Sequence, residues 1–256
     1  MELPNSDTIL YGYAIFLRAG AFLFLLPLVG RPVPVMVRTA ASLYLAVLMV
    51  ALVEPDPNVL MPQDLLDLAL LSIRELLIGA LMGFAFLLLF HTIHFAGKLI
   101  MMEVGLMQSA LFNPLTRQQD SLIGTGLTML VIVMIFTLDV HHSIIYAFMR
   151  SLEIMPGGSP IGGASVMDRL VADSGRIFVI GVQMSAPFIA VNYIVTLAFA
   201  VLGRAIPTMN VMMLSFGVRI GMGFIALIIT IFVLVQILIG MIYDSPERTL
   251  QLLPFS

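Results

Sequence analysis

The side chains in this sequence that are able to bind a metal ion form two small groups. His91 and His94 lie one helical turn apart in an apolar stretch, and Asp139, His141 and His142 lie within four consecutive positions. A zinc site needs three or four ligands that converge on one point. The first group has too few ligands. For both groups the sequence favours polar residues at helix ends or paired inside a helical bundle over a metal site, so no metal is expected.

Signatures of catalysis are missing from the sequence. Cysteine is absent, which excludes a disulfide framework and any cysteine nucleophile or cysteine-based metal site. Neither the phosphate-binding motif G-x-x-x-x-G-K-[ST] nor the zinc-protease motif H-E-x-x-H occurs. Serine, histidine and aspartate cannot be grouped into a catalytic set with any specificity. The sequence therefore indicates a protein that is not an enzyme and that uses no cofactor.

Charged side chains inside apolar stretches are the remaining candidates for a functional role. Arg18 interrupts the first apolar stretch, and Arg74 and Glu75 stand at the beginning of another. An arginine at the centre of a membrane helix costs roughly 2.5–3.5 kcal/mol on insertion scales. We expect Arg18 to make a buried polar contact, with a conduction path, a subunit contact or a place near a helix end as alternatives. Arg74 and Glu75 are expected to reach toward the membrane surface from their helix end.

The composition places these residues in a membrane protein. Of the 256 residues, 60% are hydrophobic and 11% are charged, whereas soluble domains have roughly 45–50% and about 25%. The mean hydropathy is +1.08. The net charge is −3 and Lys98 is the only lysine, so no nucleic-acid partner is expected. The acidic start of the chain lacks the basic region of a signal peptide, so the first apolar stretch is expected to remain in the mature protein.

Six long apolar stretches run through the chain. Five contain no Asp, Glu, Lys or Arg, and the first is broken only by Arg18; the stretches are residues 9–29, 39–53, 76–97, 121–138, 177–203 and 220–243. About 20 apolar residues make a helix that crosses a bilayer. Only helices or closed barrels span membranes, and the alternating strands of a barrel are missing. The sequence predicts an all-α, polytopic membrane protein of about six long hydrophobic helices, in a single domain over residues 1–256.

The connections between the stretches carry turn signals. Residues 54–67 contain three prolines and four acidic residues, which predicts an exposed turn and then a helix with Asp64 near its start. The longest connection, 139–176, includes a Pro/Gly/Ser loop at 155–163. Apolar residues at helical spacing follow that loop and predict a short amphipathic helix.

Small residues and prolines predict how the helices pack and bend. Gly79 and Gly83, like Gly217 and Gly221, have the four-residue spacing that lets membrane helices approach closely. Generic helix packing is the simplest interpretation of both pairs. Pro187 lies inside the fifth stretch and predicts a bend or a break there.

Three stretches together resemble a known family. They are FAGKLIMMEVGLMQSALFNP at 95–114, MPGGSP at 155–160 and LGRAIPTMNVMMLSFGVRIGMG at 202–223. The third is the most specific, because it has the pattern G-R-x-x-P-x-M-N between two apolar helices. With the length and the six-stretch layout, they resemble the FliR family of flagellar export-gate proteins and its injectisome counterparts across essentially the whole chain. Thr208, where the family has glutamine, and Gly217, where proline is common, depart from the pattern.

The resemblance implies a role in type III secretion. Similar proteins join P-type and Q-type subunits in a conical helical assembly of kinked helical hairpins. This assembly is the gate through which unfolded proteins cross the bacterial inner membrane. The B-type switch protein, unfolded substrate proteins and membrane lipid are further expected partners. The implied location is the inner membrane of the cell, as a multi-pass protein of the flagellar basal body. An injectisome gate subunit is one alternative, and a small-molecule transporter is another of a different class.

The resemblance also implies roles for two segments. The loop at about 105–120 is expected to point into the pore and to plug it through Met107, Leu111, Phe112, Asn113 and Pro114. This segment is too polar to span a membrane and too apolar for an idle loop, and methionine adapts well to an irregular space. Apolar constrictions also gate by losing water; an ordinary re-entrant turn is the alternative. The turn at about 203–210 is expected to be a helical hairpin used in assembly, with Gly203, Arg204, Pro207, Met209 and Asn210.

Overall fold

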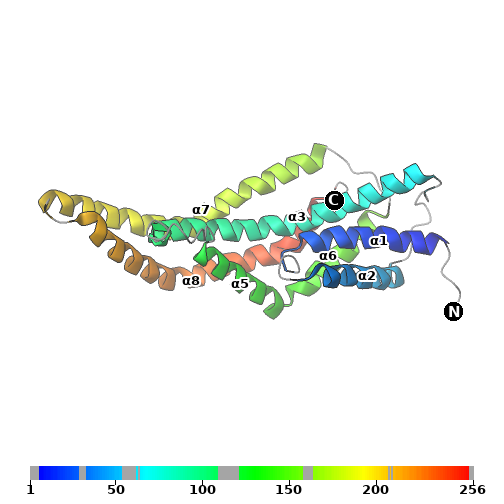
Figure 1. Ribbon diagram of the computed structural model, residues 1–256, viewed down its shortest axis with the longest axis horizontal. Helices are drawn as coiled ribbons and strands as arrows, with labels where there is room; N and C mark the ends of the chain where they lie inside the picture. Colours follow the sequence, from blue (N-terminus) through cyan, green and yellow to red (C-terminus); the bar gives the residue numbers. More distant parts are fainter. Residues whose placement is uncertain are drawn as a thin grey trace. The chain divides into compact units, whose positions relative to one another are not determined.

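The chain is built from helices. A computed structural model describes residues 6–28, 33–53, 62, 64–108, 121–157, 164–206, 208 and 210–253, and these contain no strand. Their order is α1 (Ser6–Leu25), α2 (Val35–Leu52), α3 (Leu65–Val104), the short 3-10 helix η1 (Leu106–Gln108), α5 (Leu122–Thr137), α6 (Val140–Ile154), α7 (Ala164–Ala205) and α8 (Val211–Gln251) (Figure 1). The prediction of an all-α fold is confirmed.

The number of hydrophobic helices also agrees with the sequence. In the described part of the chain, five helices are long and apolar enough to cross a membrane, and the bent pair of α5 and α6 gives a sixth candidate. α3, α7 and α8 contain 40, 42 and 41 residues, which corresponds to about 60 Å of helix. Because the hydrocarbon core is only about 30 Å thick, each of these three helices either extends beyond it or is strongly tilted.

Two predictions about the connections are wrong. Residues 140–154 were assigned to a long connection, yet they form α6, whose buried residues include Val140, Ile144, Ala147 and Phe148 at helical spacing. The amphipathic stretch after the Pro/Gly/Ser loop is no separate short helix, because it runs on without interruption as the first part of α7. α7 also continues through Pro187, so this proline does not break the helix. Asp64 directly precedes α3, as expected.

The chain divides into two compact units. Unit 1 contains Met1–Leu89, Ile135–Ser174 and Ile242–Ser256, and unit 2 contains Phe90–Met134 and Gly175–Met241. α3, α7 and α8 each contribute one part to unit 1 and the other part to unit 2. The single membrane domain over residues 1–256 stays a prediction.

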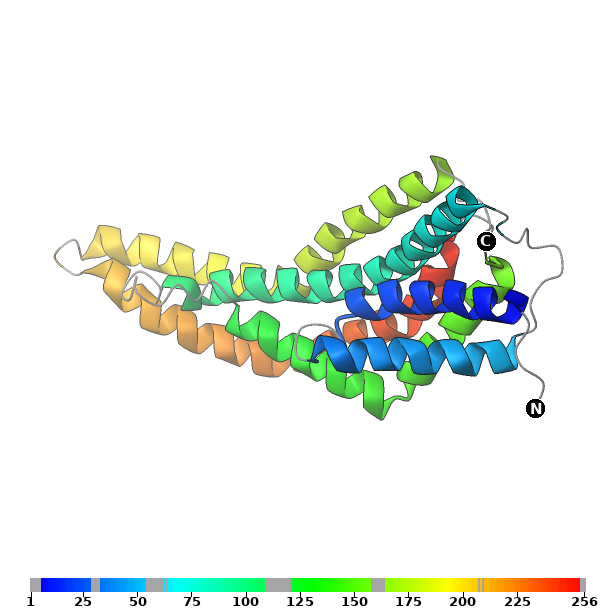
Figure 2. The same ribbon diagram turned by 45° about the vertical axis from the view of Figure 1, so that its right-hand side comes forward.

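The core of unit 1 is built on α1, α3 and α6. Phe22 of α1 packs edge-on against Phe86 of α3, with ring centroids 6.1 Å apart, and stacks on Phe148 of α6 at 5.5 Å. All three rings are buried. α2 runs alongside α1 (Figures 1 and 2), and a Cβ atom added to Gly12 would lie 3.5 Å from Cγ2 of Val50. An aromatic cluster therefore fixes three helices that are far apart in the sequence.

Two glycines bring α3 against α1 in unit 1. A Cβ atom on Gly79 would lie 2.2 Å from the carbonyl oxygen of Arg18, and one on Gly83 would lie 2.6 Å from Cβ of Leu25. Real Cβ atoms do not approach other atoms so closely, so only glycine permits this packing. The close helix contact predicted from Gly79 and Gly83 is confirmed.

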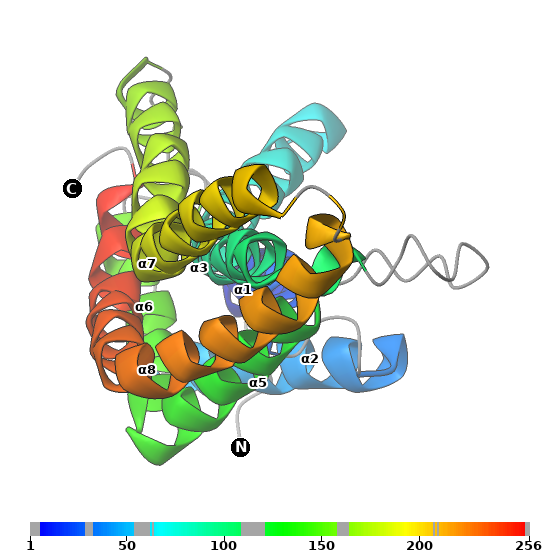
Figure 3. The same cartoon turned by 90° about the vertical axis from the view of Figure 1, so that its left-hand side faces the viewer.

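Unit 2 is organised around the C-terminal part of α3, which lies between α7 and α8 in an end-on view (Figure 3). Three helix crossings of unit 2 contain a glycine: Gly97 of α3 against Gly124 of α5, Gly181 of α7 against Phe95, and Gly223 of α8 against Val104. In each pair an added Cβ would lie between 2.2 and 2.6 Å from its nearest neighbour. These crossings therefore depend on the absence of a side chain.

The second predicted glycine pair behaves differently. Added Cβ atoms on Gly217 and Gly221 of α8 would meet nothing within 4 Å in the described chain. Both residues are exposed. The close packing expected of this pair is therefore not made within the described residues.

Candidate functional site

The first candidate site is centred on Arg18 of α1, whose side chain is fully buried. Its Nε atom donates a hydrogen bond of 2.6 Å to Oε2 of Glu75 on α3, and its Nη2 atom donates one of 3.1 Å to Oε1. Nη1 donates to the carbonyl oxygen of Ser151 at 3.0 Å, and Nη2 also donates to that of Met155 at 2.8 Å. A two-pronged arginine–carboxylate pair of this kind is among the strongest polar contacts in proteins. Arg18 thus has the buried polar contact that we expected.

The position of the two carbonyl groups explains why a cation is stable here. Ser151 and Met155 lie at the C-terminal end of α6, and the Met155 amide itself bonds to the Ser151 carbonyl. The last carbonyls of a helix carry partial negative charge, which a buried arginine neutralises. Gly157 in the following turn approaches Glu75, since an added Cβ would lie 3.8 Å from Oε1. One guanidinium group therefore joins α1, α3 and the end of α6.

The prediction that Glu75 reaches toward the membrane surface is wrong. Its side chain is 0% exposed, as is that of Arg18. A carboxylate in a low-dielectric core is stable only with a cationic or hydrogen-bonding partner, and Arg18 supplies one. Arg74 beside it is only partly exposed. The sequence identified both charges but gave no sign that they pair, because they are 57 positions apart.

The second candidate site is the segment expected to plug a pore. α3 ends at Val104, and Gly105 follows in the left-handed region with φ of 83°, which suits a glycine at a helix end. Its amide bonds to the carbonyl of Met102, and η1 begins at the next residue. Met107 in η1 is 51% exposed. Leu111, Phe112, Asn113 and Pro114 lie outside the described residues, so the plug stays a prediction.

A polar contact that the sequence did not reveal lies just before this segment. Nδ2 of Asn192 on α7 donates a hydrogen bond of 2.6 Å to Oε2 of Glu103 on α3. Both side chains are partly buried. Because Glu103 is two positions before Gly105, the bond holds the end of α3 against α7 at the place where the helix stops. The signal in the sequence was the charge of Glu103 within an apolar run.

The third candidate site is the connection between α7 and α8 in unit 2 (Figure 2). α7 ends at Ala205 and α8 begins at Val211, so the two helices form the expected hairpin. Asn210 Oδ1 accepts a hydrogen bond of 3.3 Å from the amide of Met213 and caps α8. Gly203 packs against Val211 across the turn.

The structure describes no contact for three of the residues predicted for this hairpin. Arg204 lies in the last turn of α7, where a cation is favoured, and its side chain is exposed. Pro207 and Met209 lie outside the described residues. The use of the hairpin in assembly therefore stays a prediction.

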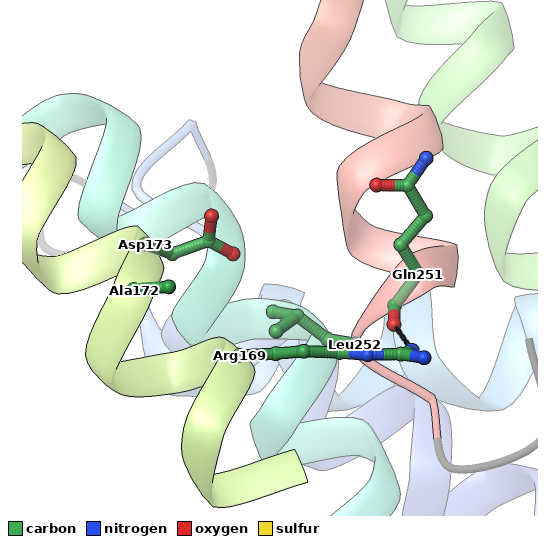
Figure 4. A pocket seen from close by; sticks show the side chains of 5 residues that line it. All are labelled: Arg169, Ala172, Asp173, Gln251 and Leu252. Atoms are coloured by element: carbon green, nitrogen blue, oxygen red, sulfur yellow. Dashed lines mark hydrogen bonds between the residues drawn. The ribbon is translucent and has the colours of Figure 1, made fainter. Parts of the chain in front are cut away.

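A hollow of about 310 Å³ in unit 1 is lined by Arg169, Ala172, Asp173, Gln251 and Leu252 (Figure 4). The Arg169 side chain on α7 crosses it and donates to the backbone carbonyl of Gln251 at the end of α8. It also donates to the carbonyl of Leu253 at 3.5 Å. Arginine at a helix C-terminus satisfies carbonyls that have no partner within the helix. The hollow is thus the place where Arg169 caps the end of α8, and the guanidinium group of Arg169 already binds backbone carbonyls there.

The apolar surfaces of the long helices are the largest unexplained feature. In the spanning windows of α2, α7 and α8, only 17%, 11% and 22% of residues are buried, whereas 50% are buried in that of α3. Lipid or other protein chains must cover such surfaces. Of these four helices α3 is therefore the most buried, and most of the apolar segment in each of α2, α7 and α8 is left uncovered by the described residues.

The sequence places this architecture in a known group. Residues 9–244 match the family described as bacterial export proteins, family 1. The chain belongs to this family. The matched residues include all seven α-helices described above, except for the beginning of α1 and the end of α8. The resemblance drawn from the sequence motifs is confirmed.

Individual relatives agree with the export family. The flagellar biosynthetic protein FliR of Bacillus subtilis is 25% identical over 249 residues, which cover 94% of this chain and 95% of the relative. FliR of Caulobacter vibrioides is 28% identical over 218 residues, or 83% and 86% of the two chains. The Yop proteins translocation protein T of Yersinia pestis is 25% identical over 168 residues, or 65% and 64%.

Proposed function

We propose that this chain is the R-type subunit of a flagellar type III protein export gate. With P-type and Q-type subunits it forms a channel in the inner membrane, at the flagellar basal body, through which unfolded flagellar proteins pass. The observation that carries this proposal is the family match over residues 9–244, together with FliR relatives aligned over most of the chain. The role is that of a channel subunit and not of an enzyme.

The structure supports a protein made for assembly. Three helices are about twice as long as a bilayer core is thick, so parts of them need cover other than lipid. Gly217 and Gly221 have the spacing for close helix packing, and Cβ atoms added to them would meet nothing within 4 Å in the described chain. Neighbouring subunits of the gate supply such cover, whereas a protein that works alone would bury this pair itself.

The injectisome alternative has one observation in its favour, the relative in Yersinia pestis. That alignment covers 65% of this chain, compared with 94% for the flagellar relative at the same identity. The flagellar role is therefore the better supported of the two. For the transporter alternative, the sequence shows no internal repeat of the kind that transporters use.

Deletion and co-purification separate these functions. Loss of motility after deletion, restored by the intact gene, is expected for a flagellar gate subunit. The purified chain is expected to bring down a P-type partner in a fixed ratio. Motile deletion cells, or a stable chain that purifies alone or as a homo-oligomer, would contradict the proposal.

The same proposal includes a pore plug in the segment that begins with Met107. Met107 is half-exposed in η1, which follows the end of α3 at Val104, and this is a suitable base for a loop that enters a lumen. Shortening residues 107–114 in the assembled complex is expected to raise ion leak across the membrane. An assembled complex with unchanged leak would remove the plug role and leave the family assignment untouched. The control is a shortening of the Pro/Gly/Ser loop between residues 158 and 163, which keeps Met155 and Gly157 in place and is expected to leave the leak at its original level.

A further inference from the structure

The break between α5 and α6 gathers three side chains with metal-binding atoms. The chain bends by 78° between these helices, and Leu138 and Asp139 form the break. One ligand atom from each of Asp139, His141 and His142 lies within 4.8 Å of the other two. We propose that these three residues bind a divalent transition metal ion of the zinc type. The sequence favours a helix-end role for this group, and three structural observations change that balance.

The first observation concerns the types of the three ligand residues and the ability of their side chains to move closer together around an ion. Two imidazoles and one carboxylate suit zinc and related divalent ions, which accept three protein ligands and keep one position for water. Ligand bonds of about 2.0–2.1 Å place neighbouring ligand atoms about 3.3 Å apart. The side chains of His142 and Asp139 are 72% and 76% exposed, so small rotations suffice to close the remaining distance.

The second observation is the backbone of Asp139. Among the described residues it is the only non-glycine with positive φ, at 57°. It occupies the N-cap position of α6, yet its side chain makes no capping hydrogen bond, although capping is the usual task of aspartate at this position. Its carboxylate instead lies 3.8 Å from Nδ1 of His142. A strained conformation that gives up a cap is a reason to look for another task of that side chain.

The third observation is an unpaired nitrogen on His141. Its Nδ1 atom is buried and has no hydrogen-bond partner among the residues that the structure describes. The ring is held by packing, with Phe136 at 5.3 Å and the ring of His142 at 4.1 Å between centroids. Buried polar atoms almost always have a partner, and an exception calls for an explanation. A metal ion bound to one ring nitrogen fixes the ring and sets which nitrogen keeps the proton.

The bound ion fixes the start of α6. All three ligands lie within four positions, so the metal joins the residue before α6 to the first turn of α6. Two neutral imidazoles and one carboxylate leave one positive charge on the bound ion, and a water molecule completes its coordination. The structure describes no other cluster of three such side chains. This inference is independent of the export role, since it depends only on the local geometry.

Metal binding by the full-length chain tests the proposal directly. The chain is purified in detergent with a tag that contains no histidine, treated with a chelator and titrated with Zn²⁺. One Zn²⁺ per chain is expected, and a large excess of Mg²⁺, an ion that prefers oxygen ligands, is expected not to displace it. Titration with Co²⁺ gives a second readout, the visible absorption of the bound ion.

Variants locate the ion. Asp139→Asn and His142→Gln change exposed side chains and are expected to lose stoichiometric Zn²⁺ binding while they retain the helical circular dichroism of the parent. His91→Gln, which removes an exposed imidazole in α3, is the matched control and is expected to bind Zn²⁺ normally. Zn²⁺ is also expected to raise the melting temperature of the parent but not of His142→Gln. A parent chain without bound Zn²⁺, or full binding by both ligand variants, would overturn the proposal.

Discussion

The two units of this protein hold their helices together by different means. Unit 1 contains a buried ion pair between Arg18 and Glu75, two carbonyl contacts and a cluster of three phenylalanine rings. Unit 2 is packed through glycines that let helix backbones approach closely, with the Glu103–Asn192 hydrogen bond as a polar contact. Unit 1 thus combines directional bonds with its own glycine crossings at Gly79 and Gly83, whereas unit 2 depends mainly on glycine crossings.

This difference has a physical reason in the membrane. Burial of apolar side chains gives no preference for one helix neighbour over lipid, so membrane helices need polar contacts or close backbone packing to associate specifically. A polar contact such as Arg18–Glu75 selects one neighbouring helix. The protein loses much stability when either residue of the pair is removed. Glycine crossings are less selective, and apolar faces of α7 and α8 remain that lipid or other protein chains must cover.

The largest expected effect comes from breaking the buried pair of unit 1. Glu75→Gln leaves the Arg18 charge buried without a counter-ion and is expected to reduce the free energy of unfolding by about 3–5 kcal/mol. The measurement is denaturant unfolding in detergent, followed by helical circular dichroism. The double variant Arg18→Met/Glu75→Leu removes both charges and is expected to recover most of that loss. Equal losses in the single and double variants would show that shape and not charge holds unit 1.

The next prediction compares a glycine at a helix crossing of unit 2 with a glycine at which an added Cβ would meet no neighbour. A Cβ on Gly97 would lie 2.2 Å from Cα of Gly124, so Gly97→Ala is expected to cost about 1–3 kcal/mol through forced separation of α3 and α5. Gly217→Ala is the control, because an added Cβ there meets nothing. It is expected to leave the isolated chain unchanged or stabilise it by up to about 1 kcal/mol.

Gly217 also tests whether α8 carries a subunit contact. Gly217→Leu and Gly221→Leu are expected to keep the stability of the isolated chain and to reduce recovery of the complex with its P-type partner. Full recovery of the complex with both variants would show that this face of α8 meets lipid.

A smaller effect is expected from the polar contact of unit 2. Asn192→Ala removes the donor to Glu103, and hydrogen bonds to charged groups contribute about 1.5–3 kcal/mol. Because both side chains are only partly buried, the loss is expected near the lower end of this range. Glu103→Gln keeps an acceptor for Asn192 and is the matched control. Thermal melting in detergent measures both, and equal melting of Asn192→Ala and the parent would make this bond unimportant for unit 2.

The smallest expected effect concerns the cap of α8. Asn210→Ala removes the hydrogen bond to the Met213 amide and is expected to cost about 1 kcal/mol. Asn210→Asp keeps a good capping side chain and is expected to melt close to the parent. The comparison is made by thermal melting. An Asn210→Asp variant that loses as much as Asn210→Ala would point to a role for the amide beyond capping.

The sequence alone determined the fold class, which is all-α, the number of hydrophobic helices and the protein family. Long apolar stretches fix these features because a backbone in lipid must satisfy its own hydrogen bonds as helix. The sequence also identified Arg18 as a residue that needs a partner, because burying a charge is costly wherever the helix packs. The two ends of the α7–α8 hairpin were likewise visible in the local pattern.

Tertiary structure decided the contacts between segments that are distant in the chain. The sequence did not pair Arg18 with Glu75, match Gly97 with Gly124, or separate the packed pair Gly79 and Gly83 from the open pair at 217 and 221. The spacing within one helix is set by its own geometry, whereas its neighbour depends on the packing of all the others. The sequence did not predict α6, because polar residues interrupt its apolar face. The buried residues of α6 become evident only from the core of unit 1.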